Sequence, residues 1–211
     1  MPPTTNVYID GFNLYKGCIS GTPYKWLNPF HLAELLLCDH SVREVNYFTA
    51  IVKDRVEDPQ QSQRQDTYLK ALETIPGVVA HLGHFRTRKK RVWVLQEQSD
   101  GGHFATAKVT EEKGTDVMLA TRLVWDACHQ MMHRALVVTN DSDFQASIEL
   151  AMGEGIDVVT VNPHHHVGQR DHLKGTDHRR IRRGHLERSQ LPSTVHAADG
   201  TQIRKPVEWG P

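Results

Sequence analysis

The chain has 211 residues, and its 25 Lys and Arg are balanced by 25 Asp and Glu, so the formal net charge is zero with neutral histidine. This length predicts one domain with a hydrophobic core, and no stretch approaches the roughly 20 apolar residues that a membrane-spanning helix needs. The first ten residues lack the basic and apolar segments of a signal peptide, and the three scattered cysteines argue against a disulfide framework or a cysteine zinc site, so we expect a cytoplasmic protein.

The first predicted element is a short buried strand, Val7-Tyr8-Ile9, which stops at Asp10-Gly11. Strands and helices then alternate along the chain, which is typical of a mostly parallel sheet with helices on both faces. We therefore predict an α/β fold with a central sheet of about five strands. The other predicted strands cover 42–52, 78–82, 135–139 and 156–161, and the predicted helices cover 29–38, 60–75, 115–132 and 143–153.

Residues 84–110 alternate basic and apolar side chains, which predicts an irregular β-ribbon inserted before the next helix. Within this ribbon, residues 86–91 read RTRKKR, with five positive charges and no negative charge. RNA phosphates are the expected partners of these cations, with Phe85 or Trp93 available for base stacking. A ribbon kept soluble by its charges is an equally good interpretation. The candidate RNA-binding residues are Arg86, Arg88, Lys89, Lys90 and Arg91.

After Asn162-Pro163 the chain becomes rich in His and Arg. Short helices are predicted at 169–175 and 184–190, and residues 191–211 carry Pro, Ser, Thr and Gly, which is typical of a loose tail. The run His164-His165-His166 is interpreted as an exposed loop, because adjacent histidines rarely converge on zinc without other ligands.

Acidic side chains follow two of the predicted strands. Asp10 follows the first strand directly, and Asp141 and Asp143 follow the strand at 135–139. Open parallel sheets bind their ligands outside the carboxyl ends of the strands, and neighbouring strands lie about 4.8 Å apart. If these two strands are neighbours, the carboxylates would repel one another unless a cation neutralised them. Mg²⁺ and Mn²⁺ favour oxygen ligands, so the sequence predicts a divalent metal site at this edge.

Asp116 supports the same interpretation, because it opens the helix at 115–132 on the face that should pack against the sheet. Each aspartate taken alone has a second interpretation. An aspartate after a strand often caps the next helix, as Asp10 could, and Asp116 and Asp143 could each favour a helix dipole. Ser142 fits the N-cap of a capping box. The interpretation that all four aspartates act only as caps is less favoured.

The aspartates belong to three motifs, Tyr8–Leu14 (YIDGFNL), Glu112–Val117 (EKGTDV) and Thr139–Phe144 (TNDSDF). In this order and over about residues 5–190, they resemble the motifs of NYN-domain proteins, in the LabA-like branch of the PIN-like nuclease superfamily. The resemblance implies a Rossmann-like PIN fold and metal-dependent RNA cleavage. By matching position, it also implies metal-site roles for Asp10, Asp116, Asp141 and Asp143, with Asn13 beside them.

The resulting expectation is a divalent-metal-dependent endoribonuclease, a hydrolase in which Mg²⁺ or Mn²⁺ activates water. Its domain would cover 1–190, with a tail at 191–211. We expect single-stranded or structured RNA as partner and no membrane partner, and a homo-oligomer is left open. A non-catalytic RNA-binding or regulatory module is the alternative, whereas Phe12, two residues after Asp10, argues against a phosphatase. The candidate catalytic residues are Asp10, Asn13, Asp116, Asp141 and Asp143, and the four aspartates are the candidate metal ligands.

Overall fold

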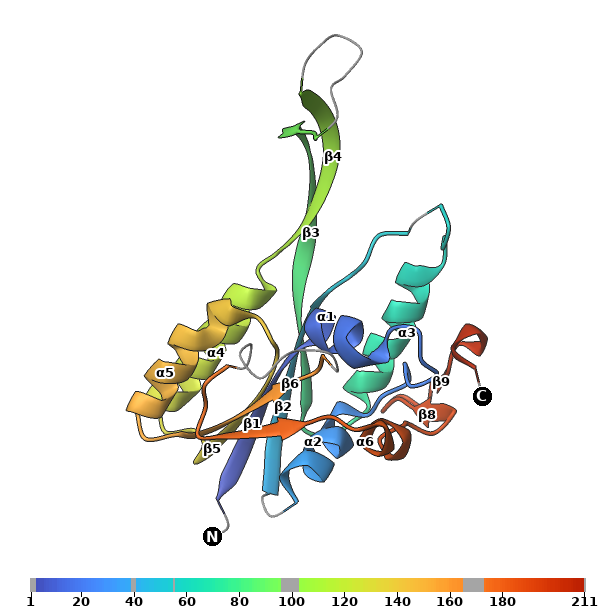
Figure 1. Cartoon of the computed structure of the whole chain (residues 1–211). Helices are drawn as coiled ribbons and strands as arrows, with labels where there is room; N and C mark the ends of the chain where they lie inside the picture. Colours follow the sequence, from blue (N-terminus) through green and yellow to red (C-terminus); the bar gives the residue numbers. More distant parts are fainter. Residues whose placement is uncertain (1–2, 39–40, 55, 96–102, 165–172, 211) are drawn as a thin grey trace.

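A mixed β-sheet runs through the centre of the chain (Figure 1). The computed structural model describes residues 3–38, 41–54, 56–95, 103–164 and 173–210, and within these ranges the sheet has seven strands in the order β4-β3-β2-β1-β5-β6-β7. Six of these strands are parallel to one another, and β4 is antiparallel to its neighbour β3. The strands are β1 (Thr4–Asp10), β2 (Ser41–Ala50), β3 (Val78–Trp93), β4 (Phe104–Lys113), β5 (Arg134–Val138), β6 (Asp157–Asn162) and β7 (Asp177–Arg180).

The fold is α/β as expected, but the prediction of about five strands is wrong. The strand expected at 78–82 does not end there, because β3 continues unbroken to Trp93 and pairs with β4 along the ribbon. The ribbon is therefore an extension of the sheet edge. The other additional strand, β7, reads DHRR and forms by pairing with β6. A run that short and polar has none of the apolar alternation that identifies a strand in a sequence.

Helices cover both faces of the sheet (Figure 1). The alternation of β1 separates the two cores: Val7 and Ile9 pack on one side with Leu14, and Tyr8 packs on the other side with Leu123. The first side carries α1 (Gly11–Leu14), the π-helical turn η1 (Tyr15–Ile19), α2 (Pro29–Leu37), α3 (Gln61–Glu73) and α6 (Arg183–Arg188), and the second carries α4 (Thr115–Cys128), the 3₁₀ turn η2 (Ser142–Phe144) and α5 (Gln145–Gly153).

The segment after residue 190 has more structure than its composition suggested. It forms the hairpin β8 (Thr194–His196) and β9 (Gln202–Arg204), followed by the turn η3 (Val207–Trp209). The ring of Trp209 lies 6.0 Å from that of Trp26 and 6.1 Å from that of Tyr68, measured between centroids. These aromatic contacts hold the turn on the side of α3, and the domain boundary at residue 190 stays a prediction.

Two further expectations concern the same end of the chain. The helix predicted at 184–190 corresponds to α6. Most of the helix predicted at 169–175 lies outside the described residues, as do His165 and His166. None of the helices in the described ranges is long and apolar enough to span a membrane.

A buried carboxylate ties α4 to the central strand. Tyr8 Oη donates a hydrogen bond to Asp126 Oδ2 at 2.7 Å, and Asn6 Nδ2 donates to the same oxygen at 3.3 Å. Arg122 Nε donates to Asp126 at 2.9 Å, and its Nη2 reaches Glu44 on β2 at 3.0 Å. Burial raises the pKa of Tyr8, and the hydrogen bond to Asp126 raises it further, so the phenol stays a neutral donor. The network therefore fixes how α4 lies along β1 and β2.

Replacing Asp126 tests this network. Asp126→Ala should lower the free energy of unfolding by about 3 kcal/mol, because two buried donors and an arginine lose their acceptor. Asp66→Ala is the matched control, since Asp66 also pairs with a residue four positions along its helix, Lys70 at 2.7 Å, but both side chains are exposed. Its cost should stay below about 1 kcal/mol. Urea unfolding followed by circular dichroism measures both, and equal losses would contradict the structural role of Asp126.

Candidate functional site

Asp10 occupies the carboxyl end of the central strand, and the fold uses its side chain twice. Asp10 Oδ1 caps α1 by accepting a hydrogen bond from the backbone N–H of Asn13 at 2.9 Å. Asp10 Oδ2 accepts from the hydroxyl of Thr139 at 3.1 Å, just beyond β5. Burial raises the pKa of Asp10, and the charge of Asp116 adds to this rise, while the hydrogen bonds oppose it. Asp10 is therefore a helix cap and also a close neighbour of the other acids.

The loop after β5 is held against the start of α1. Asn13 lies beside Asp10 as expected, and its side-chain oxygen accepts a hydrogen bond from the backbone N–H of Asn140 at 3.1 Å. Asn13 thus positions the residues that lead into Asp141. The buried side-chain oxygen of Asn140 has no hydrogen-bond partner among the described residues. A direct contact between Asn13 and a substrate stays a prediction.

Asp141 and Asp143 lie at the first turn after β5. Asp141 Oδ1 accepts from the backbone N–H of Asp143 at 3.0 Å and thereby caps η2. The capping box expected from Ser142 does not form, because Asp141 takes the N-cap position one residue earlier. Asp141 is partly exposed, and Asp143 is exposed. The strands β1 and β5 are direct neighbours, which is the adjacency that the argument from sequence required.

Asp116 lies in the first turn of α4, within electrostatic range of Asp141 and Asp143. Its side chain is exposed and does not lie on the face that packs against the sheet, where the sequence had placed it. Partial desolvation raises the pKa of its carboxyl group, and the charges of Asp141 and Asp143 raise it further. Burial also raises the pKa of Glu112, with additional repulsion from Asp116 and Asp10. Glu112 was not among the predicted site residues, and its only signal in the sequence is its place in the EKGTDV motif. We call the five acids the acidic cluster: Asp10, Glu112, Asp116, Asp141 and Asp143.

The acidic cluster offers oxygen donors alone, which suits Mg²⁺ or Mn²⁺. Its spacing is not that of an assembled metal site. In the part of the chain that the structure describes, no group of three or more His, Cys, Asp or Glu side chains could hold a metal ion. Metal binding by Asp10, Asp116, Asp141 and Asp143 therefore stays a prediction.

The predicted RNA-binding residues are divided between the two faces of the ribbon, because side chains alternate along β3. Arg86, Arg88 and Lys90 share one face with Glu111, which forms ion pairs with Arg88 at 3.0 Å and with Lys90. The hydrogen bond from Lys90 is the main cause that lowers the pKa of Glu111 to about 2. Glu111 thus offsets part of the positive charge on this face, with one negative charge against three cations.

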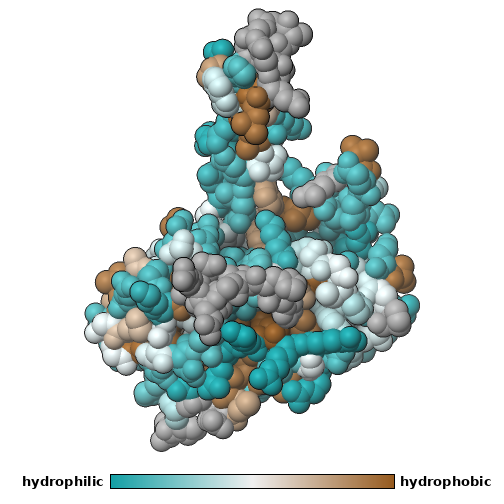
Figure 2. Space-filling model, viewed as in Figure 1, coloured by the Kyte–Doolittle hydropathy of each residue, from teal (hydrophilic) through white to brown (hydrophobic). Residues whose placement is uncertain are grey.

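The other face carries Lys89 and Arg91 together with aromatic rings. The guanidinium carbon of Arg91 lies 4.5 Å from the centre of the Phe104 ring, and Trp93 is 61% exposed. Figure 2 shows hydrophobic surface near the far end of the ribbon, among hydrophilic side chains. RNA binding by the ribbon stays a prediction.

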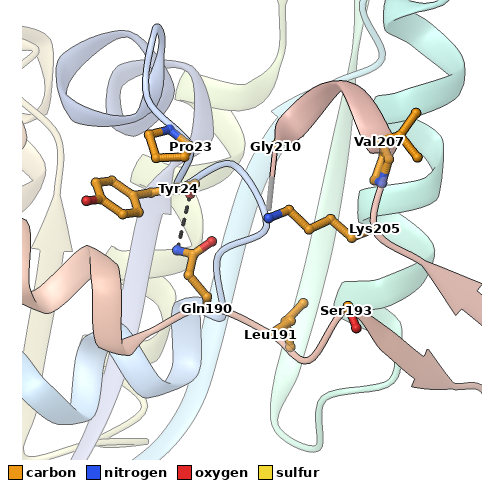
Figure 3. Close-up of a pocket in the computed structure, with 9 residues that line it drawn as sticks. Pro23, Tyr24, Gln190, Leu191, Ser193, Lys205, Val207 and Gly210 are labelled. Carbon is orange, nitrogen blue, oxygen red and sulfur yellow. Dashed lines mark hydrogen bonds between the residues drawn. The ribbon is translucent and has the colours of Figure 1, made fainter.

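Two cavities bear on the position of the site. The first, of about 580 Å³, lies beside the C-terminal segment and is lined by Tyr24, Gln190 and Lys205 among others (Figure 3). Gln190 Nε2 donates to the backbone oxygen of Tyr24 at 3.4 Å along its wall. None of the predicted site residues lines this cavity.

The second cavity, of about 600 Å³, begins at the residues that follow Asp10, although no acid of the acidic cluster lines it. It is lined by Gly11 and Phe12, directly after Asp10, and by Tyr47 of β2. Burial raises the pKa of Tyr47, and the charge of Asp10 adds to the rise, so the Tyr47 hydroxyl lies within electrostatic range of Asp10. Gly11 permits this close packing, because a Cβ there would lie 2.8 Å from the Phe48 carbonyl oxygen and 2.9 Å from the Tyr47 ring.

Comparisons with known proteins bear on the reaction class. No family model matches the chain. The chain is 28% identical, over 239 aligned positions, to a Pseudomonas putida protein named 6-hydroxy-3-succinoylpyridine 3-monooxygenase HspA, and the match covers 99% of this chain and 76% of that protein. A solved structure of a protein of unknown function from Vibrio parahaemolyticus covers 86% of this chain and 94% of its own, with a TM-score of 0.49 and 14% identity.

The monooxygenase name corrects the function expected from the sequence. A monooxygenase is an oxidoreductase, whereas the expected endoribonuclease is a hydrolase, so the nuclease prediction is wrong. The non-catalytic RNA-binding alternative gains no support, because the relative is named as an enzyme. Carboxylates at the edge of a sheet take part in many different reactions, so their positions alone do not identify which reaction a protein catalyses. The resemblance to NYN-domain proteins stays a prediction, since neither comparison bears on it.

Charge removal tests the repulsion within the acidic cluster. Asp116→Asn should raise the stability of the metal-free protein by about 0.5 kcal/mol, because it removes repulsion with Asp141 and Asp143. The gain should shrink in 1 M salt, where the charges are screened. Asp66→Asn is the control, because it removes an attraction to Lys70 and should give no gain. Thermal unfolding in EDTA at low and high salt measures both variants. A gain that does not depend on salt would rule out repulsion as its cause.

Proposed function

We propose that this chain is a monooxygenase that inserts one oxygen atom of O₂ into a small aromatic substrate. The observation that carries the proposal is the likeness to the Pseudomonas putida monooxygenase along 99% of this chain. The substrate in that protein's name is a hydroxypyridine with a succinoyl side chain, which ends in a carboxylate. We therefore propose a hydroxylated aromatic ring with an acidic side chain as the substrate class.

The proposed reaction balances only with an electron donor. One oxygen atom becomes a hydroxyl group of the ring. It enters a carbon–hydrogen bond, or, at the carbon that carries an acyl side chain, as position 3 does in the relative's named substrate, it replaces that side chain, which takes up water and leaves as a carboxylic acid. The second oxygen atom takes two protons and two electrons and becomes water. A two-electron donor of the reduced nicotinamide dinucleotide class therefore takes part as co-substrate.

We place the reaction at the acidic cluster, because parallel sheets bind ligands at the carboxyl ends of their strands. Asp10 and Asp141 lie at the ends of the neighbouring strands β1 and β5, and Asp10 directly precedes Gly11 and Phe12, which line the second cavity. Their carboxylates would accept hydrogen bonds from a ring hydroxyl and orient the ring. Asn13 would hold the loop that carries Asp141 in place, through its hydrogen bond to Asn140.

A divalent cation is a further part of the proposal. The described side chains form no assembled metal site, so Asp10, Asp116, Asp141 and Asp143 would have to turn toward one another to hold Mg²⁺ or Mn²⁺. The charge of the ion would then offset the repulsion among them. When bound, such an ion supplies a Lewis acid that polarises an oxygen atom of the substrate.

We also propose a cytoplasmic location. Cys18, Cys38 and Cys128 are all free thiols. Reducing compartments keep thiols in this state, and secreted proteins more often pair them. The reduced nicotinamide donor that the reaction needs fits the same compartment.

Labelled oxygen tests the reaction. Purified protein is incubated with ¹⁸O₂, reduced nicotinamide dinucleotide, Mg²⁺ or Mn²⁺, and 6-hydroxy-3-succinoylpyridine or related hydroxypyridine carboxylates. Mass spectrometry should find one ¹⁸O atom in the product ring, with oxygen and donor consumed in equal amounts. Asp141→Asn should lower the rate by at least about 100-fold, which corresponds to about 2.7 kcal/mol of barrier height.

The control for this experiment is Asp66→Asn, because Asp66 lies on the exposed side of α3 and should leave the rate unchanged. Product labelled from H₂¹⁸O and not from ¹⁸O₂ would exclude a monooxygenase. An equal rate in wild type and Asp141→Asn would move the reaction away from the acidic cluster.

Thermal unfolding tests the metal. Mn²⁺ at ten times its dissociation constant should stabilise the wild type by about 1.4 kcal/mol, because a ligand of the native state adds RT ln(1 + [L]/Kd). Asp141→Asn should lose most of this gain, while Asp66→Asn should keep it. Calorimetric titration provides the dissociation constant. If millimolar Mn²⁺ produces no heat of binding in the titration and no shift of the melting temperature, the protein does not bind the cation as proposed.

A further inference from the structure

The second cavity has an aromatic wall. Tyr47, Tyr68 and Trp209 all line it, with ring centroids 6.2 Å apart for Tyr47 and Tyr68 and 6.1 Å apart for Tyr68 and Trp209. Phe12 lines it near Asp10, and the Phe12 ring packs against Phe85 at 5.7 Å. The volume of about 600 Å³ suits one small molecule, since such sites usually measure about 300–1,000 Å³. A planar ring is the ligand that this wall would bind best.

The same cavity carries positive charge that the protein does not neutralise. Lys16 and Lys25 line it, and neither makes an ion pair with another described residue. Arg64 also lines it, but Arg64 pairs with Asp58 and lies 3.8 Å from Glu208. These two acids carry one charge more than Arg64, so the charged side chains that line the cavity sum to one positive charge, and the two lysines provide it.

The cavity and the acidic cluster are linked through Gly11 and Phe12, which follow Asp10 and line the cavity. Lys16 lies within electrostatic range of Glu112, and the Tyr47 hydroxyl lies within range of Asp10. A ring in the cavity would therefore have one edge toward the carboxylates of the acidic cluster. Its anionic group would be attracted to the lysines and repelled by the acids, so the charges favour one orientation of the ligand.

We propose that this cavity binds a planar aromatic ring that carries a carboxylate, with the ring against Tyr47, Tyr68 and Trp209 and the carboxylate held by Lys16 and Lys25. The inference rests on the proposed function, in which this ligand is the substrate. It adds the residues that select the ligand and a binding mode that can be measured without turnover.

Calorimetry without oxygen or electron donor tests the carboxylate contact. The probes are 6-hydroxynicotinate and its neutral counterpart 6-hydroxynicotinamide. Wild type should bind the carboxylate roughly tenfold more tightly than the amide, because charge-assisted hydrogen bonds exceed neutral ones. Lys25→Met should remove most of this preference and leave amide binding almost unchanged. Lys205→Met is the matched control, because Lys205 lines the other cavity (Figure 3) and should change neither affinity.

A second pair of variants tests the ring contact. Trp209→Leu should weaken both probes by roughly tenfold, because a planar ring loses the aromatic surface on which it stacks. Trp125→Leu is its control, since Trp125 is 59% exposed on α4 and does not line the cavity. Melting curves of all four variants confirm that each is folded before its affinity is compared.

The outcomes separate this inference from the proposed function. Equal binding of the two probes by wild type, or equal effects of Lys25→Met and Lys205→Met, would overturn the assignment of the cavity. Tighter binding of adenosine monophosphate with the same dependence on Lys25 would also overturn it, in favour of a nucleotide. The expected binding without ¹⁸O incorporation would support the cavity and refute the monooxygenase. If ¹⁸O is incorporated at a rate that neither Lys25→Met nor Trp209→Leu changes, the monooxygenase is supported and the assignment of the cavity is refuted.

Discussion

The geometry of the acidic cluster depends on the buried carboxylate of Asp126. This residue accepts hydrogen bonds from Asn6 and Tyr8 on the central strand and from Arg122 on its own helix. A network of this kind tolerates one register of α4 along β1, because any slip would leave buried polar groups unpaired. A helix rises about 1.5 Å per residue, so this register also sets the place of Asp116, about 15 Å away along α4. The polar contacts of Asp126 near one end of α4 thus fix the position of Asp116 at the other end, despite the repulsion between Asp116 and the neighbouring acids.

Two different environments lie on either side of the carboxyl end of β1. On one side, Asp10, Asp116 and Glu112 lie close enough for their charges to raise one another's pKa values. On the other side, an aromatic cavity carries the lysines that the protein leaves unpaired. Between them, Gly11 allows β2 and the start of α1 to approach closely. A site that combines negative charge, positive charge and an aromatic wall over a short distance is suited to orient a small polar ring.

The acids of this chain illustrate why a motif predicts a place better than a reaction. The three motifs contain the carboxylates that we expected to meet, and β1 and β5 are neighbours as that argument required. The same carboxylates can bind a cation, orient a hydroxyl or cap a helix, and Asp10 and Asp141 do act as caps. The motifs predicted an endoribonuclease, but the relative found by sequence comparison is named as a monooxygenase. The chemistry of a site also depends on what lies beside it, and no motif described the cavity.

The sequence by itself determined the elements whose signals are local. Short apolar runs identified the central strands, and the spacing in 115–132 identified α4. The residues at the ends of β1 and β5 and at the start of α4 located four of the five acids. The tertiary structure decided what depends on distant partners. β7 is a strand because β6 offers it a free edge, and β3 runs on because β4 pairs with it. The cavity joins Phe12, Tyr68 and Trp209, which meet only when α1, α3 and the C-terminal turn pack together. Periodicity records the surroundings of one segment, whereas contacts between segments far apart in the chain arise only from packing.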